Sequence, residues 1–460
     1  MKKNVIWYLV DQLRADALGI NGDKNARTPN LDNFAKQSVN FNKAVCGFPL
    51  CCPSRASLIT GKYAHNNGVV GHEYQLAPSH LTIADMFNSA GYDTIYIGKW
   101  HLSALLDNKG AERIGTKVIP KDLRGRFKSF IGYENNNSPF DCYVHGHDGD
   151  LEIDVYKLPK YETDALTDIA IDKINEHANS GKSQPFFMVI SVQPPHDPYI
   201  APAKHLRNFC ESELELRPNV PPYEHIVSQA RRDLTGYYAA LEAIDDNFGR
   251  LIDELDKHGL YEDTHIIFLS DHGDMHGSQG MLRKTNPYEE SIRVPVIIGG
   301  GGRMAEDKHH LCGEDHALIN SVDIAPTSLG LCGIEIPEVM EGIDFSANRL
   351  DLRKEKNAPS SAYIQSVVPT YHNDSINKPW RGIVTSDGYK YVCFEHSEWL
   401  MFNLNDDPYE LVNLVHNALF CEKRKELNQQ LRDWIEKTDD DFSVPVIDKT
   451  DIDYFEETRG

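Results

Sequence analysis

The residues with the clearest chemical potential lie in the stretch 50–61. Cys51 is followed by Pro53 and, four residues on, by Arg55. Pro53 is typical of the first position of a helix, and Gly61 is typical of a helix C-terminus. Cys51 is therefore expected just before a helix N-terminus, where free N–H groups favour negative charge. A thiol placed there can be an activated nucleophile, with Arg55 donating hydrogen bonds to the same point. The alternative is a buried cysteine pair beside a helix cap.

More polar residues follow apolar runs that are expected to form β-strands, over residues 5–10, 94–97, 186–192 and 266–269. The residues that come just after these runs, or a little further on, are Asp11, Gln12, Lys99, His101, His196, Asp271, His272 and Lys284. Ligands of open α/β sheets bind at the carboxyl ends of the strands. Each of these residues alone has a plain structural explanation, such as a helix cap or a surface turn. Their convergence on one edge of a sheet indicates an enzyme.

The elements that must position these residues alternate between strands and helices. Helical patterns cover residues 81–90, 163–177 and 234–255. This alternation predicts an α/β fold, with a large mixed or mostly parallel sheet between helices. A hairpin around residues 386–388 and a terminal helix over residues 421–435 predict a smaller α+β subdomain on an antiparallel sheet. We therefore expect a catalytic domain over residues 1–355 and a C-terminal subdomain over residues 356–460.

The composition narrows the classes of partner. The chain has 460 residues and a formal net charge of −22, which argues against a nucleic-acid partner. It has no apolar run of the roughly 20 residues that a membrane helix requires, so no membrane partner is expected. Its nine cysteines form no tight spacing pattern, which favours free thiols. We expect a cytoplasmic protein if residue 1 is the native start, and a periplasmic or secreted one if a signal peptide was removed.

Two motifs are similar to those of a known family. The spelling Cys-x-Pro-Ser-Arg-Ala-Ser-Leu-x-Thr-Gly from Cys51 resembles the signature of the formylglycine-dependent sulfatases, and Gly98-Lys99-Trp100-His101 resembles their second signature. The resemblance implies the alkaline-phosphatase-like fold. It also implies that a maturation enzyme oxidises Cys51 to formylglycine, whose hydrate is the nucleophile. Cys52 falls on a variable position of the signature.

The resemblance further implies one divalent cation and a role for each site residue. The implied metal ligands are Asp11, Gln12, Cys51, Asp271 and His272. Oxygen-rich ligation suits Ca²⁺, and the imidazole leaves Mn²⁺ or Mg²⁺ as alternatives. Arg55 and Lys99 would stabilise the nucleophile and the sulfuryl oxygens. His196 with Lys284 would protonate the leaving oxygen, and His101 would be the base that restores the aldehyde.

The implied reaction is hydrolysis of a small sulfated substrate, with a saccharide as the first expectation. The alternatives are an aryl or alkyl sulfatase of the choline-sulfatase type, a phosphonate monoester or phosphodiester hydrolase of the same superfamily, and an inactive carbohydrate-binding relative. The residues that could line the substrate pocket, or equally belong to the surface, are His145, His147, His372, Trp380 and Arg381.

Overall fold

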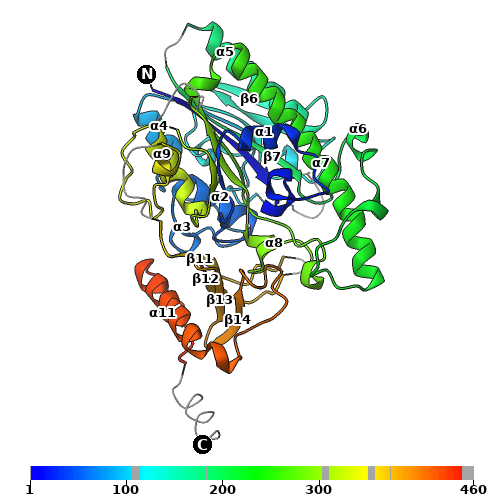
Figure 1. Ribbon diagram of the computed structural model, residues 1–460. Coiled ribbons are helices and arrows are strands. Elements are labelled where there is room, and N and C mark those ends of the chain that lie inside the picture. Colours follow the sequence, from blue (N-terminus) through cyan, green and yellow to red (C-terminus); the bar gives the residue numbers. More distant parts are fainter. Residues whose placement is uncertain are drawn as a thin grey trace, which may run out of the picture.

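The computed structural model describes residues 2–105, 114–181, 184–302, 310–350, 358–372 and 375–447, and these form two sheets with their helices (Figure 1). The larger sheet has ten strands in the order β10-β2-β9-β8-β1-β7-β3-β4-β5-β6. Its strands are β1 (Asn4–Asp11), β2 (Val39–Phe41), β3 (Asp93–Lys99), β4 (Ser129–Tyr133), β5 (Tyr143–Asp148), β6 (Leu151–Lys157), β7 (Phe186–Pro195), β8 (Thr264–Ser270), β9 (Val296–Gly300) and β10 (Gly313–Asp315). The expected α/β fold is confirmed.

The centre of this sheet is parallel. Strand β1 pairs in parallel with β7 and β8, β7 pairs in parallel with β3, and β3 pairs in parallel with β4. Each residue of β1, β7 and β8 is buried, which explains why these strands read as unbroken apolar runs. Because β1, β7, β8 and β3 point the same way, the residues that follow them meet at one edge.

Helices cover both faces of the sheet, and alternate residues of β1 divide between them. Ile6 and Tyr8 pack into one core with α1 (Pro29–Ala35), α5 (Glu162–Asn179) and the long α7 (Glu224–Lys257). Val5 and Trp7 pack into the opposite core. That second core contains residues of α2 (Cys51–Thr60), α4 (Ile83–Ser89) and α9 (Ile324–Leu331). The sheet is therefore the middle of three layers and holds its strand ends rigidly.

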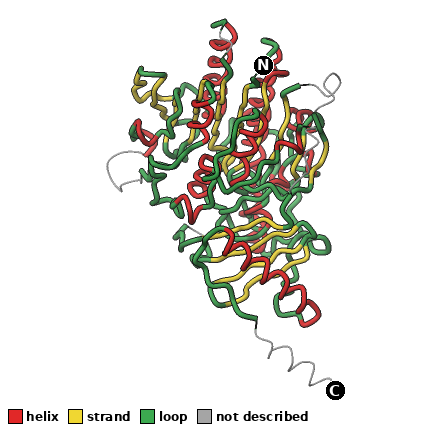
Figure 2. The backbone as a smooth tube through the Cα atoms, turned by 90° about the vertical axis from the view of Figure 1, so that its left-hand side faces the viewer, coloured by secondary structure: helices red, strands yellow, loops and turns green. Residues whose placement is uncertain are grey.

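The smaller sheet lies at the C-terminal end of the chain and is antiparallel throughout. Its strands, in spatial order, are β11 (Ser361–Ser366), β12 (Trp380–Thr385), β13 (Tyr389–Phe394) and β14 (Ser397–Asn403). Helix α11 (Cys421–Lys437) packs across one face, as Figure 2 shows. The predicted hairpin is present, and Gly388 takes the positive φ of 90° that its turn requires. The predicted boundary at residue 355 lies outside the described residues.

The second face of the small sheet is joined to the larger part. Ile364 and Val392 share an apolar cluster with Val45 and Ile292. Short helices complete the described fold: α3 (Ala64–Asn67), α6 (Ala203–Leu206), α8 (Glu289–Ile292) and α10 (Ser346–Arg349). Among the helices of the described ranges, none combines the length and the apolar character needed to cross a membrane.

Candidate active site

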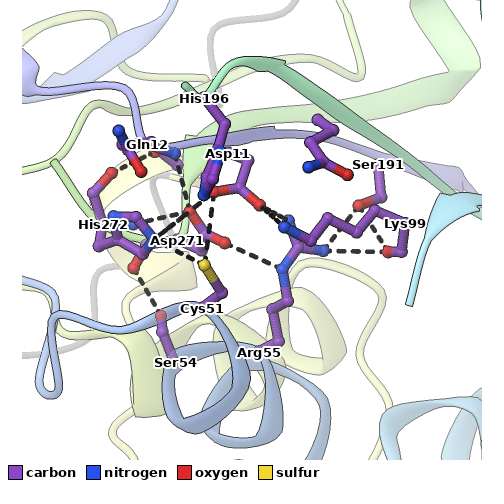
Figure 3. A network of polar contacts seen from close by, with 12 residues as sticks. Asp11, Gln12, Cys51, Ser54, Arg55, Lys99, Ser191, His196, Asp271 and His272 are labelled. Carbon is purple, nitrogen blue, oxygen red and sulfur yellow. Dashed lines mark hydrogen bonds and ion pairs between the residues drawn. The ribbon is translucent and has the colours of Figure 1, made fainter. Parts of the chain in front are cut away.

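The structure brings the predicted residues together beside the N-terminus of α2. Figure 3 shows Cys51 and Arg55 rising from this helix toward side chains that come from the strand ends. Those side chains belong to Asp11, Gln12, Lys99, His196, Asp271 and His272, and Lys284 hydrogen-bonds to the same group. Apart from His196, which is partly buried, all of these side chains are almost fully buried. The sequence-predicted cluster therefore exists as one buried polar centre.

Helix α2 begins slightly earlier than expected. Cys51 is its first residue, with Leu50 as the extended N-cap, and Pro53 is the third residue rather than the first. The difference has a simple reason, because none of the first N–H groups of a helix has a partner and proline is tolerated throughout that turn. Gly61 ends the helix with a φ of 65°. Cys51 and Arg55 lie one turn apart and face the same way.

The Cys51 thiol has charged and polar groups around it. Its Sγ lies 3.1 Å from Nε2 of His272, 3.2 Å from Nζ of Lys284 and 3.7 Å from Oδ1 of Asp11. Burial works to raise the pKa of Cys51, but Lys284, Lys99 and His272 outweigh it and hold that pKa well below its usual value. The position therefore favours an anionic group.

Arg55 and Lys99 supply fixed positive charge on the other side of the site. Arg55 donates from Nε to Asp271 Oδ2 at 2.9 Å and from Nη2 to Asp11 Oδ2 at 3.1 Å. Lys99 Nζ lies 2.6 Å from the same Asp11 oxygen. These contacts are buried, so they are weakly screened by solvent. They give the site a local positive field inside a chain whose net charge is −22.

The acidic and imidazole groups fit a divalent cation. One ligand atom from each of Asp11, Cys51, Asp271 and His272 lies within 4.8 Å of the others, and all four residues are buried. Gln12 adds an amide oxygen beside them, which now accepts a 2.7 Å hydrogen bond from Lys284. Burying these polar and charged groups away from water costs free energy where hydrogen bonds do not fully compensate, and a bound cation would offset that cost.

Two histidines have geometry suited to proton transfer. His196 Nε2 lies 2.9 Å from Lys284 Nζ, and this pair adjoins the Cys51 thiol. His101 is 8% exposed, and its Nδ1 is buried with no hydrogen-bond partner among the described residues. Burial and the neighbouring Lys99 lower the pKa of His101 well below its usual value. His101 is therefore neutral and able to accept a proton.

Two polar residues that support the site were not predicted. Asp274 accepts a 2.5 Å hydrogen bond from Nε2 of Gln12 and a 2.8 Å bond from Tyr199. Ser191 accepts a 2.8 Å bond from Arg55. Each had a weak signal in the sequence: Ser191 interrupts an apolar strand, and Asp274 follows Asp271 in the same loop. Neither signal indicates which side chain it supports.

Four of the five predicted pocket residues have structural roles instead. His145 accepts from the backbone N–H of residue 119, and His147 contacts Arg124, both on the distal side of β4. Trp380 donates to a backbone carbonyl at residue 285, and Arg381 pairs with Asp440. The fifth, His372, lies edge-to-face on His72, whose ring lies beside that of His101. His372 and Trp380 therefore lie near the site, Trp380 through its bond to the residue that follows Lys284.

Comparisons with known proteins show to which proteins the chain is similar. The family profile described as Sulfatase matches residues 3–334, and the one described as N-sulphoglucosamine sulphohydrolase, C-terminal, matches residues 277–437. An ulvan-active sulfatase from Formosa agariphila is 34% identical over 448 residues, which cover 96% of this chain and 82% of that protein. An arylsulfatase from Clostridium perfringens is 29% identical over 459 residues, with 92% of each chain covered.

A solved structure shows the same fold over nearly the whole chain. The protein BT4656, in complex with D-glucosamine-2-N,6-O-disulfate, superposes with a TM-score of 0.80 at 24% identity, covering 96% of this chain and 99% of that one. The match to the first profile includes α2, the strand ends around it and Lys284. The resemblance seen in the sequence is thus confirmed, and the chain belongs to the sulfatase family of enzymes.

Proposed function

We propose that this sulfatase hydrolyses sulfate esters of carbohydrates with a nucleophile made from Cys51. The observation that carries the proposal is the position of the Cys51 Sγ, which lies within 3.2 Å of both His272 Nε2 and Lys284 Nζ and one helical turn from Arg55. After oxidation by a maturation enzyme, the formylglycine hydrate supplies a hydroxyl group at this point. The reaction adds water across the ester and yields an alcohol and inorganic sulfate.

A divalent cation would be held by Asp11, Gln12, Asp271 and His272, together with the modified side chain at position 51. Carboxylate and amide oxygens favour Ca²⁺, and the imidazole nitrogen keeps Mn²⁺ and Mg²⁺ as alternatives. The cation would supply Lewis acidity beside the nucleophile and neutralise charge on the sulfuryl group. Calorimetric titration with Ca²⁺ of the chelator-treated protein tests this ligand set. The Ca²⁺ affinity of an Asp271→Asn variant should be lower than that of the wild type.

The protein groups around this centre divide the remaining work. Arg55 and Lys99 are fixed by buried contacts to Asp11, so they orient the nucleophile and stabilise negative sulfuryl oxygens without reorganising. His196, held at 2.9 Å from Lys284, donates a proton to the leaving alcohol oxygen. His101, which is neutral, accepts a proton in the step that releases sulfate and restores the aldehyde.

A carbohydrate is the proposed substrate class because of the relatives. The relative at 34% identity is named an ulvan-active sulfatase, and the structure of BT4656 was solved with the sulfated sugar D-glucosamine-2-N,6-O-disulfate as its substrate. Sulfate release from a panel of defined sulfated saccharides, measured beside an aryl sulfate and choline sulfate, tests this assignment. A saccharide should be the substrate with the highest kcat/KM. A higher value for choline sulfate would replace the carbohydrate assignment.

A phosphonate monoester or phosphodiester hydrolase is the second candidate, since the Asp11-Gln12 and Asp271-His272 pairs also suit such relatives. Lys99 and His101 favour the sulfatase activity, because both lie beside the nucleophile and suit a monoanionic sulfuryl group with a base for its release. Rates on an aryl sulfate and on the matching aryl phosphonate separate the two. A faster phosphonate reaction would exclude the first proposal.

A further inference from the structure

A second group of thiol and imidazole side chains, the donor types of a metal site, lies beside the nucleophile. One ligand atom from each of Cys52, His72 and His101 lies within 4.8 Å of the others. They come from three separate segments: Cys52 from the first turn of α2, His101 from the loop after β3, and His72 from the loop between α3 and α4. The family signature leaves the position of Cys52 variable, so nothing in the proposed hydrolysis requires a thiol there.

The rings in this group have unused nitrogen atoms. Nδ1 of His101 and Nε2 of His72 are buried and have no hydrogen-bond partner among the described residues. The two ring centroids are 5.0 Å apart. Cys52 is 1% exposed, and its thiol forms part of the apolar core beneath them. An unpartnered, buried imidazole nitrogen is costly, and a bound metal ion would satisfy it.

We propose that Cys52, His72 and His101 form a binding site for Zn²⁺ or a similarly soft divalent metal ion, distinct from the oxygen-rich cation site. One thiolate and two imidazoles are preferred ligands of zinc, whereas Ca²⁺ requires six to eight oxygen atoms. Zinc bonds of about 2.0–2.3 Å place tetrahedral ligand atoms about 3.3–3.8 Å apart, so a contraction of about 1 Å completes the site. His72 is only partly buried and lies on a loop that can provide this movement.

Metal binding would also control the enzyme. The thiol of Cys52 loses its proton when the metal binds, and water takes the fourth position of a three-ligand site. His101 is both a ligand of this site and, in the proposed function, the base that restores the aldehyde. A zinc ion on its ring would occupy the lone pair that accepts the proton. This consequence rests on the proposed function, whereas the binding site itself does not.

Cobalt titration tests the site without any activity assay. The protein is a full-length Cys51→Ser variant kept in excess Ca²⁺, so that Cys52 is the thiol at the site and the oxygen ligands are occupied. Added Co²⁺ should produce a thiolate-to-cobalt charge-transfer band with one ion bound. A further Cys52→Ser substitution should abolish the band, and Cys46→Ser should keep it, because the Cys46 thiol is buried and bonded to a backbone carbonyl at residue 48. A band that survives Cys52→Ser, or no band in the parent, would overturn the proposal.

A second variant covers the case in which Cys52→Ser fails to fold. His72→Phe keeps a ring against His101 and removes one ligand, so cobalt affinity should fall at least about tenfold, the lower end of the effect seen when an outer-shell partner is lost. In the matured enzyme the same substitution should raise the Zn²⁺ concentration for half-inhibition by a similar factor. Unchanged cobalt affinity in His72→Phe would refute the site. Unchanged inhibition with weakened cobalt binding would refute only its link to His101 in catalysis.

Discussion

The buried lysine that joins the small sheet to helix α8 offers the sharpest test of how the parts of the molecule are held together. Lys390 lies on β13 of the small sheet, and its ammonium group is fully buried. It contacts Glu289 and Glu410 at 2.7 Å each and donates to a backbone carbonyl at residue 287 at 2.9 Å. Two carboxylates therefore share one cation at the junction.

Replacing Lys390 with methionine removes the charge and keeps most of the volume. Among the described residues, Glu410 is left without a cation, and Glu289 keeps only its 3.2 Å contact with Arg293. Breaking one partner out of a buried pair costs about 3–5 kcal/mol. We expect Lys390→Met to lower the free energy of unfolding by this amount at pH 8, where carboxyl groups favour the charged form. The measurement is urea unfolding followed by tryptophan fluorescence, with the shift in midpoint multiplied by the slope m.

The matched control removes the carboxylate charges as well. A triple variant, Lys390→Met with Glu289→Gln and Glu410→Gln, removes the charges of all three residues, so it should recover at least about 2 kcal/mol relative to the single variant. If the free energy of unfolding of Lys390→Met lay within about 0.5 kcal/mol of the wild-type value, the cluster would behave like a surface site. A triple variant no more stable than the single one would equally refute the reasoning.

Three further predictions concern the site and the pH dependence. His196→Asn should lower kcat for alkyl sulfates by about 10²–10⁴ and kcat for activated aryl sulfates much less, since only a poor leaving group requires a proton. Equal losses in kcat on both substrates would contradict the role of His196. Asp274→Asn should weaken Ca²⁺ binding about 10–100-fold in a calorimetric titration, because Asp274 holds the amide of Gln12 with its oxygen toward the cluster; unchanged affinity would contradict this. Burial and the nearby Glu289 raise the pKa of Glu410 from 4.5 to about 7 against the attraction of Lys390, so the folded protein keeps a proton that the unfolded chain releases. The free energy of unfolding should therefore decrease as pH rises from about 4.5 to about 7. Glu410→Gln should flatten this decrease in urea titrations at several pH values. An unchanged decrease in the variant would mean that other groups cause the pH dependence.

The location of the site could be predicted from the sequence because it follows from the strands. Asp11 and Asp271 each end a run in which every residue is buried on both faces, and such runs belong to the parallel centre of a sheet. Parallel neighbours have their carboxyl ends at one edge, so the two carboxylates had to meet. The same reasoning placed Lys99 and His196 there without any knowledge of the helices.

Contacts that depend on side-chain direction could not be predicted in this way. Asp274 reaches Gln12 because the chain turns sharply after β1, where Gln12 has a φ of 66°. His72 approaches His101 through a loop with no periodic pattern. Arg381 illustrates the same point, because it lies in a strand and its partner Asp440 is far away in the sequence. Long-range pairing of polar groups leaves no local signal.

The proposed hydrolysis depends most directly on position 51 as the source of the nucleophile. The decisive measurement is the rate of sulfate release by chain that has been matured with a formylglycine-generating enzyme, compared between wild type and Cys51→Ala. Cys142→Ala is the control, because Cys142 is a buried thiol in the core on the face of the sheet opposite α2. We predict that Cys51→Ala loses at least about 10⁴-fold in kcat while the control stays active. Sulfate release by Cys51→Ala at a rate near that of wild type would contradict the central claim.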